Sequence, residues 1–323
     1  MSVVPPLPQS PGPPPALGTG PGSTGPGSTA LGIGEVLWDR LPGGDEIGGA
    51  PLNVVSHLAR LGHPAAYLTA VGQDPPGDAA VAAMRSRGIA TGLVGQVAGV
   101  PTGLAQVTLG PGGSPEFAIG RPAAFEHWPD GDVGQAVAMR PAVLVYGTLA
   151  QLSPHARAAL ARIAGAARVA LYDVNLRDGW WSPAVVAELT GPATVLKLSL
   201  AEARELAPVL GVAWSANLAQ VTADLARRHG LRGVAVTAGP DRAALWLDGE
   251  FAAAAPPPVR VADAVGAGDA FAAGLLDAIA RGRRAAPALR RASALGALVA
   301  SRRGAQPPWT PAELAALEEP GTG

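Results

Sequence analysis

Residues 261–276 read Val-Ala-Asp-Ala-Val-Gly-Ala-Gly-Asp-Ala-Phe-Ala-Ala-Gly-Leu-Leu, and the other informative parts of the chain can be arranged around this stretch. Small residues form a turn at Gly266-Ala267-Gly268, and apolar residues then recur at helical spacing. The pattern predicts a glycine turn that opens a helix. The first turn of a helix leaves backbone N–H groups unpaired and carries the positive end of the macrodipole, so this turn suits an anion such as a phosphate. We expect Asp269 to lie beside that anion.

An acidic residue in the first turn of a helix is common whether or not anything binds there. Two glycines and a second carboxylate nearby favour a functional interpretation, because a loop that only capped a helix would not need so bare a backbone. Asp263-Ala-Val-Gly-Ala-Gly-Asp269 resembles the C-terminal signature of the ribokinase-like (PfkB) carbohydrate kinases. In that family the last aspartate deprotonates the sugar hydroxyl, and the Gly-Ala-Gly amides hold the transferred phosphoryl group. The resemblance implies that Asp269 is the base and that Gly266, Ala267 and Gly268 form the anion hole.

The composition limits the partners that this chain can have. Its 24 Lys and Arg residues nearly balance its 25 Asp and Glu residues, so charge gives no support for a nucleic-acid or membrane-surface partner. The absence of cysteine excludes disulfides, thiolate metal sites and cysteine catalysis. No apolar run reaches the roughly 18 residues of a membrane helix, and the N-terminus has no basic region ahead of an apolar stretch. We therefore expect a cytoplasmic protein that binds small molecules, with neither nucleic acid nor membrane as a partner.

Changes in composition divide the chain into three expected segments. Residues 1–30 are rich in proline and glycine and have no charged side chain, so they cannot bury enough apolar surface to offset the entropy of ordering. We expect a disordered tail there. A proline-rich ligand for another protein is the alternative, but the prolines are irregular and no basic residue flanks them. Residues 31–308 are expected to form the kinase domain, and residues 309–323 a C-terminal tail.

The first apolar stretch of the expected domain is interrupted by Glu35 and Asp39. This stretch contains two glycines but not the third glycine that a dinucleotide-binding motif requires, so that motif is excluded. Gly48 and Gly49 come shortly before Asn53 and open a helix with one apolar face. Paired glycines alone would indicate only a turn. Together with Asp39 and Asn53 they resemble the family's N-terminal signature, which implies that these two polar side chains bind sugar hydroxyls and that Gly48 and Gly49 let the sugar approach the backbone.

Two segments of alternating polarity, 102–109 and 116–119, flank a glycine-rich turn and predict a β-hairpin. In the resembling family such strands leave the main sheet and form a small lid over the sugar, which we expect here from about residues 36–51 and 100–125. Family lids often pair, so the resemblance also implies a homodimer through the lid. Arg121 follows the hairpin, and its interpretation as a substrate contact or as an exposed charge stays open.

From residue 142 onward, short apolar segments alternate with helical patterns, which predicts a parallel sheet covered on both faces. The fold class is therefore α/β. The resemblance makes it a Rossmann-like, ribokinase-like core with helices on both faces and a small β lid. Ligands of such sheets bind beyond the carboxyl ends of the strands, where Asp173-x-Asn175-x-Arg177 is expected. This segment resembles the one in fructokinases and 2-keto-3-deoxygluconate kinases, which implies that Arg177 contacts the substrate.

Lys197 is the only lysine in the chain, and no Gly-x-x-x-x-Gly precedes it, which excludes a Walker A loop. Nucleotide phosphates would therefore be held by helix ends and arginines. The resemblance implies ATP as the nucleotide, Mg²⁺ held through water by Glu202, and a monovalent cation, K⁺, near Asp263. The nucleotide contacts that it implies are Lys197, Thr237, Gly239, Gly266, Gly268 and Ser293.

These observations predict an ATP-dependent kinase that phosphorylates a sugar hydroxyl and is most similar to fructokinases. A 2-keto-3-deoxygluconate kinase is the first alternative, because Arg121 and Arg177 could pair a substrate carboxylate bidentately. The second alternative is a sugar- or nucleotide-binding homologue without catalysis. Only two departures from the family pattern favour it: Ala264, where threonine is usual, and Ser199, where asparagine is usual.

Overall fold

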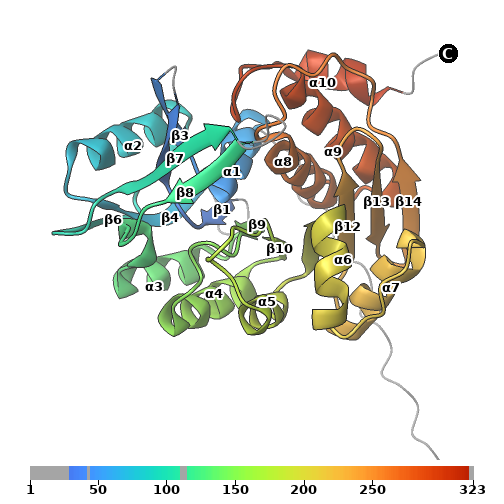
Figure 1. The fold of residues 1–323 in the computed structure, drawn as a ribbon, viewed down its shortest axis with the longest axis horizontal. Coiled ribbons are helices and arrows are strands. Elements are labelled where there is room, and N and C mark those ends of the chain that lie inside the picture. Colours follow the sequence, from blue (N-terminus) through green and yellow to red (C-terminus); the bar gives the residue numbers. More distant parts are fainter. Residues whose placement is uncertain (1–28, 42–43, 110–114, 320–323) are drawn as a thin grey trace, which may run out of the picture.

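The computed structural model describes residues 29–41, 44–109 and 115–319 (Figure 1). The strands are β1 (Ala30–Ile33), β2 (Leu37–Leu41), β3 (Gly44–Gly48), β4 (Ala65–Gly72), β5 (Ile89–Ala90), β6 (Val94–Val97), β7 (Gly103–Leu109), β8 (Pro115–Ile119), β9 (Val143–Tyr146), β10 (Val169–Asp173), β11 (Val195–Ser199), β12 (Gly233–Ala238), β13 (Arg242–Leu247) and β14 (Glu250–Ala254). The helices are α1 (Ala50–Arg60), α2 (Pro75–Ser86), the 3₁₀ turn η1 (Ala124–Glu126), α3 (Asp130–Met139), α4 (Pro154–Ala166), α5 (Pro183–Thr190), α6 (Leu200–Val209), α7 (Leu218–His229), α8 (Ala267–Ala280), α9 (Ala285–Ala300) and α10 (Pro311–Glu318).

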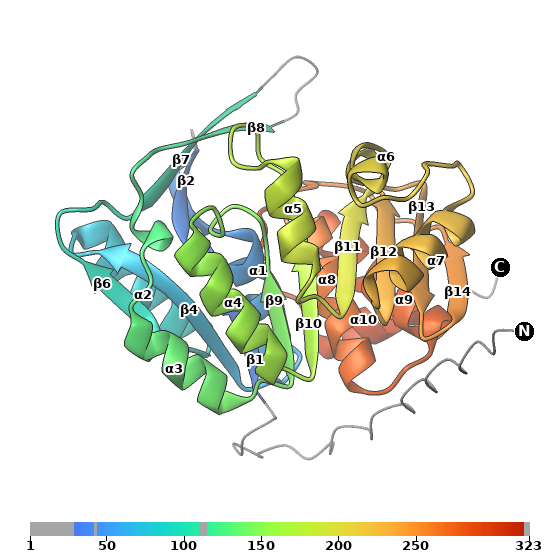
Figure 2. The same cartoon turned by 90° about the horizontal axis from the view of Figure 1, so that it is seen from below.

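The main sheet has the order β14-β13-β12-β11-β10-β9-β1-β4-β5, and β6 also pairs with β4. Its pairs are parallel from β12 to β5, whereas β13 and β14 add an antiparallel edge. Helices α3 to α7 cover one face, and α1, α2, α8 and α9 cover the other (Figure 2). Strands β1, β4, β9 and β10 are buried along their whole length, as expected for parallel strands between two helical layers. The predicted α/β class is confirmed.

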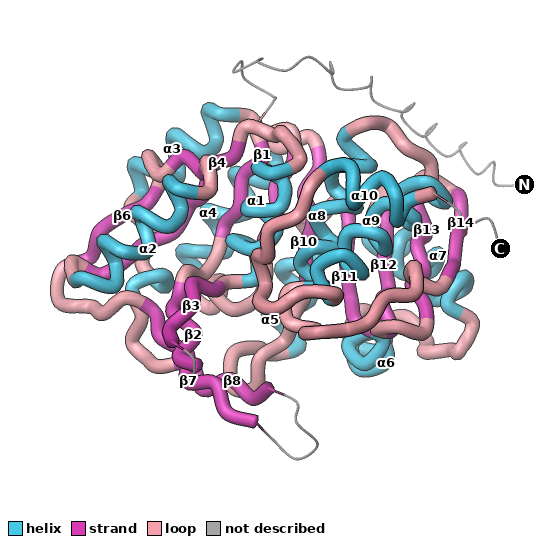
Figure 3. The backbone as a smooth tube through the Cα atoms, turned by 90° about the horizontal axis from the view of Figure 1, so that it is seen from above, coloured by secondary structure: helices cyan, strands magenta, loops and turns pink. Residues whose placement is uncertain are grey.

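A second, four-stranded sheet stands apart from the main one, in the order β3-β2-β7-β8 (Figure 3). Strands β7 and β8 form the predicted antiparallel hairpin, and β2 joins it through a parallel pairing with β7. Because β1 leads directly into β2, this sheet rises from the carboxyl end of the main sheet. That end is where an α/β sheet binds its ligands.

Two expected boundaries differ from the structure. Ala30 already pairs with Ala65 in the main sheet, so the described domain begins slightly before residue 31. Residues 1–28 of the predicted tail lie outside the described residues. The expectation of a C-terminal tail from residue 309 is wrong for its first part. Trp309 is buried, its indole Nε1 donates to His57 Nδ1 over 3.1 Å, and α10 follows. The missed signal is the capping box of Thr310 and Glu313.

Among the described residues, no helix is both long and apolar enough to cross a membrane.

Candidate active site

The predicted glycine turn opens α8 as expected. Gly266 caps the helix with φ of 76°, and a Cβ at this position would lie 2.5 Å from Cα of Ala305, so both the backbone angle and the space require glycine. The N–H of Ala267 donates to the carbonyl of Ala264 over 3.3 Å. The N–H groups of Gly268 and Asp269, in the first turn, have no intrahelical acceptor by their position. The start of α8 therefore has the geometry of an anion site.

Asp269 is partly exposed at this helix start. Its Oδ2 accepts a hydrogen bond from Asn53 Nδ2 over 2.8 Å, which joins α8 to α1. Burial raises the pKa of Asp269 above its ordinary value, and the Asn53 amide and the cations Lys197 and Arg177 offset only part of this increase. The structure thus brings together two residues that lie far apart in the sequence and that were predicted to share one substrate.

A buried ion pair lies beneath the helix start. Asp173 and Lys197 face each other in the β10–β11 register, and Lys197 Nζ lies 2.8 Å from both oxygens of Asp173. Burial raises the pKa of Asp173 to about 6 despite the lysine. Burial alone would lower the pKa of Lys197, but Asp173 more than offsets this and the pKa is raised, so the side chain stays an ammonium. A Cβ on Gly268 would lie 3.5 Å from Lys197 Nζ, which places this positive charge directly under the anion site.

The two predicted sugar-binding glycines make room for acidic residues. A Cβ on Gly48 would lie 2.3 Å from Asp39 Oδ2, and a Cβ on Gly49 would lie 2.3 Å from the carbonyl oxygen of Glu35. Burial raises the pKa of Asp39 to about 6, Arg177 lowers it, and Glu46 and Asp269 raise it. Asp39, Arg177 and Asp269 are therefore close enough to act on one another electrostatically.

Glu35, for which the sequence predicts no role, lies close enough to Arg177 and Asp269 for their charges to act on it. Its side chain is buried, and Oε1 accepts the N–H of Ala50 over 2.9 Å at the start of α1. Its Oε2 is buried and has no hydrogen-bond partner within the described residues. Burial raises the pKa of Glu35 to about 7. A charged residue in an otherwise apolar stretch was the available signal.

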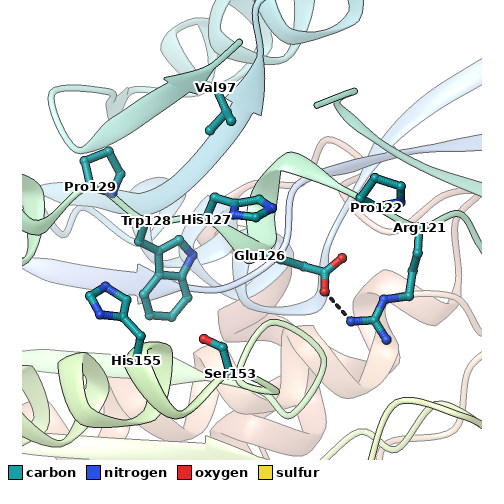
Figure 4. Close-up of a pocket in the computed structure, with 9 residues that line it drawn as sticks. All are labelled: Val97, Arg121, Pro122, Glu126, His127, Trp128, Pro129, Ser153 and His155. Atoms are coloured by element: carbon teal, nitrogen blue, oxygen red, sulfur yellow. Dashed lines mark hydrogen bonds and ion pairs between the residues drawn. The ribbon is translucent and has the colours of Figure 1, made fainter. Parts of the chain in front are cut away.

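The two predicted substrate arginines lie in different surroundings. Arg177 donates to Asn175 Oδ1 over 2.7 Å, and its charge lowers the pKa of Asp269. Arg121 instead pairs with Glu126 over 2.5 Å, and its guanidinium lies 4.4 Å from the ring centre of Trp180. It lines a cleft of about 920 Å³ with His127, His155 and their neighbours (Figure 4). Of these two arginines, only Arg177 lies close enough to Asp269 to lower its pKa.

Glu202 and Asp263, the two residues predicted to bind cations, already accept hydrogen bonds from backbone N–H groups. Glu202 accepts the N–H of Leu176 over 2.8 Å and that of Ser199 over 2.7 Å, and Ser199 caps α6 in return. Asp263 accepts the N–H of Val265 and that of Gly304, each over 3.0 Å, and so connects the turn before α8 with the segment after α9. Within the described residues, no group of three or more His, Cys, Asp or Glu side chains is arranged to hold a metal ion.

The remaining predicted nucleotide contacts lie on neighbouring elements. Thr237 pairs with Ser199 at the carboxyl ends of β12 and β11, and Gly239 follows with φ of 54°. Ser293 lies inside α9, which packs on α8, and its hydroxyl is buried without a hydrogen-bond partner among the described residues.

One residue in contact with the site was not singled out by any sequence pattern. Gln306, in the segment between α9 and α10, donates from Nε2 to Asn53 Oδ1 over 2.7 Å. Its separation from Asn53 along the chain, and the absence of a motif around it, explain why sequence reasoning missed it.

Comparison with known proteins gives a consistent picture. Residues 44–312 match the family model described as pfkB family carbohydrate kinase. Fructokinase-1 of Oryza sativa subsp. japonica is 31% identical over 280 residues, covering 80% of this chain and 84% of that protein. Fructokinase-1 of Zea mays is 30% identical over 293 residues, covering 84% of this chain and 88% of that protein.

Solved structures share the fold at lower identity. The fructokinase of Xylella fastidiosa with bound ATP superposes with a TM-score of 0.75 at 24% identity, covering 90% of this chain and 98% of that one. The 2-dehydro-3-deoxygluconokinase of Thermotoga maritima superposes with a TM-score of 0.79 at 18% identity, covering 90% and 99%.

Proposed function

The chain belongs to the PfkB family of carbohydrate kinases and is a phosphotransferase that acts on a sugar, and from this premise we propose that it transfers the γ-phosphoryl group of ATP to fructose with Asp269 as the base. The observation that carries the proposal is the position of Asp269. A carboxylate with a raised pKa lies at the start of a helix, above a buried ammonium and in contact with Asn53. A general base works best when its pKa approaches the operating pH.

Phosphoryl transfer leaves a protein mainly the tasks of positioning and charge stabilisation. Asn53 occupies Oδ2 of Asp269, so Oδ1 is the oxygen assigned to the sugar hydroxyl. In the proposed step the hydroxyl gives its proton to Asp269, its oxygen forms a bond to the γ-phosphorus, and the bond from that phosphorus to the bridging oxygen breaks to release ADP. The first-turn N–H groups of α8 and the Lys197 ammonium stabilise the negative charge of the transferred group.

Magnesium would supply further neutralisation of phosphate charge. Glu202 fits such a cation held through water, because each of its carboxylate oxygens accepts one backbone N–H and retains a lone pair. Glu202 is the residue proposed to hold it through water. Asp263 is proposed for potassium; each of its oxygens already accepts one N–H and retains a lone pair.

Fructose is favoured as the substrate by two observations. The curated relatives at 30 and 31% identity are fructokinases. The alternative, 2-keto-3-deoxygluconate, was based on two arginines clamping a carboxylate, and Arg121 is already paired with Glu126. Both residues that depart from the family pattern still hold backbone groups: Ser199 caps α6, and the carbonyl of Ala264 accepts the N–H of Ala267 in the turn before α8. We therefore propose that the protein is catalytic.

We also propose a homodimer through the four-stranded sheet. Its edge strands β3 and β8 each pair with only one other strand within the described residues.

The test is turnover of ATP with a panel of fructose, ribose, glucose and 2-keto-3-deoxygluconate, measured as sugar phosphate formed. We expect the highest kcat/KM with fructose. A higher value with the keto acid would move the substrate assignment to the sugar acid, and ATP binding without turnover of any sugar would contradict the catalytic proposal.

A further inference from the structure

The contacts of Asp269 continue beyond Asn53 through two further side chains. Arg87 Nε donates to Gln306 Oε1 over 2.5 Å, Gln306 Nε2 donates to Asn53 Oδ1 over 2.7 Å, and Asn53 Nδ2 donates to Asp269 Oδ2 over 2.8 Å. These residues come from the C-terminal end of α2, the segment before α10, α1 and α8. We call this series the amide relay.

The direction of the amide relay is fixed by chemistry at both ends. A guanidinium can only donate hydrogen bonds, and an ionised carboxylate can only accept them. The amide of Gln306 must therefore turn its oxygen toward Arg87 and its NH₂ toward Asn53. The amide of Asn53 must then turn its own NH₂ toward Asp269. If Asn53 were reversed, two oxygen atoms would face each other at Asp269 without a proton between them.

The backbone around Gln306 is held on both sides. The carbonyl of Ala305 lies 3.0 Å from His57 Nε2, and the carbonyl of Pro307 accepts a hydrogen bond from Arg60 over 2.7 Å. Burial lowers the pKa of His57 to about 4, so this imidazole is neutral at neutral pH and donates from Nε2 while Nδ1 accepts from Trp309. The guanidinium of Arg87 is also held, because its Nη1 donates to the carbonyl of Ala83 over 2.8 Å. Gln306 is thus presented to Asn53 from a fixed position.

We propose that Gln306 is a positioning residue for Asp269: it fixes the amide of Asn53 so that the carboxylate stays ionised and oriented with Oδ1 toward the substrate. This inference rests on the proposed function for its kinetic consequence. Hydrogen bonds in a series polarise one another, by about 10–30% for each bond. A change at the Gln306 side chain therefore reaches Asp269 through Asn53, because the hydrogen bonds of that side chain go to Arg87 and Asn53.

Two substitutions break the amide relay in different ways. Gln306→Leu keeps the approximate volume and removes both hydrogen bonds. Gln306→Glu keeps an acceptor for Arg87 but has no proton to give Asn53. The matched controls are Gln220→Leu and Gln220→Glu, at an exposed glutamine on α7. Each protein is measured for melting temperature, for the pH dependence of kcat/KM, and for the titration of Asp269 by carboxyl-carbon NMR.

We expect both Gln306 variants to melt near the parent temperature. Because the Asn53 hydrogen bond lowers the pKa of Asp269, weakening it should raise the pKa of Asp269 seen by NMR and the pKa of the acid limb of kcat/KM, each by roughly half a pH unit. Turnover should fall roughly tenfold, less than the ~100-fold that a 1 Å misplacement can cost, and the KM for ATP should be unchanged. The Gln220 variants should match the parent in every measurement. A purely structural role would lower the melting temperature and leave the titration in place, which would overturn the proposal.

The NMR titration needs no turnover and therefore separates two kinds of failure. If the parent phosphorylates no sugar, the proposed function is wrong, and the titration of Asp269 in the Gln306 variants still decides whether the amide relay acts on that carboxyl. If the parent is active and the Asp269 titration is the same in parent and variants, the amide relay is wrong and the kinase assignment is unaffected.

Discussion

Helix α8 carries two aspartates with opposite surroundings. Asp277 is completely buried and accepts hydrogen bonds from His63 over 2.8 Å, from Arg281 over 2.9 Å and from Arg291. Burial would raise its pKa, but these three donors more than offset the effect, and the pKa is lowered. Asp269, two turns earlier, is partly exposed and accepts a hydrogen bond from the amide of Asn53, and its pKa is raised.

The comparison shows what separates a structural carboxylate from a reactive one on the same helix. Burial raises the pKa of both carboxyls, and the surrounding groups more than offset this increase at Asp277 but offset only part of it at Asp269. Two guanidinium groups and an imidazole leave Asp277 with little affinity for a proton. At Asp269 the Asn53 amide and the charges of Lys197 and Arg177 leave the pKa raised, so this carboxylate keeps the affinity for a proton that a base requires.

The largest expected effect comes from Asp269→Asn. Asparagine keeps the shape of the side chain and suits a helix start, but it cannot accept a proton. Turnover should fall by roughly 100- to 10,000-fold, with Michaelis constants for ATP and sugar nearly unchanged. Saturation kinetics and a melting curve on the same preparation check this. A variant with turnover within a few-fold of the parent would show that the carboxylate only complements the helix dipole.

The next effect is on stability and comes from Asp277→Ala. Removal of this carboxylate leaves His63 and Arg281 without the contact and Arg291 with Glu318 as its remaining acidic partner. Losing one member of a buried charge network costs about 3–5 kcal/mol. Denaturant unfolding should show this loss, whereas turnover of the folded protein well below its melting temperature should be unchanged. A strong loss of turnover in the folded variant would contradict the claim that Asp277, unlike Asp269, has only a structural role.

A smaller effect concerns Glu35, whose pKa of about 7 lies above the ordinary value of 4.5. The folded protein holds this proton more tightly than the unfolded chain, so the stabilisation is present below pH 4.5 and is lost as the pH rises toward about 7. Glu35→Gln keeps an acceptor for the N–H of Ala50 and removes the titration. Between about pH 5 and pH 8 its unfolding free energy should therefore fall less than that of the parent, by on the order of 3 kcal/mol. Parallel curves for the two proteins in urea titrations would contradict the assignment.

Local patterns were enough to predict most of the fold. The parallel core and the β7–β8 hairpin follow from apolar runs, alternation and glycine turns, and the start of α8 follows from Gly266 and the helical spacing after it. The C-terminal tail was predicted wrongly at its start, because the capping box of Thr310 and Glu313 begins helix α10 there.

The site was only partly predictable, because the missing information lies in contacts between distant segments. Asp269 and Asn53 were found through motifs, and the structure joins them. Gln306 reaches Asn53 across most of the chain, and the pairing of Arg121 with Glu126 depends on how the segment after β8 folds back. Glu35 could be noticed as a charge in an apolar stretch, but its unpartnered oxygen depends on tertiary packing.

The central claim, that Asp269 is the base, is tested most directly by comparing two titrations of the parent protein. The acid limb of kcat/KM for the sugar reports an essential base of the free enzyme, and carboxyl-carbon NMR, assigned with Asp269→Asn, reports Asp269 itself. Asp39 and Asp173, with pKa values of about 6, and Glu35, with a pKa of about 7, are the neighbours whose titrations must be resolved from it. We predict that the kinetic limb coincides with the titration of Asp269, above the ordinary aspartate value, and that Asp277 titrates below that value. The assignment of Asp269 as the base would be contradicted if the acid limb of kcat/KM coincided with the titration of another carboxyl. It would also be contradicted if Asp269 titrated as low as Asp277.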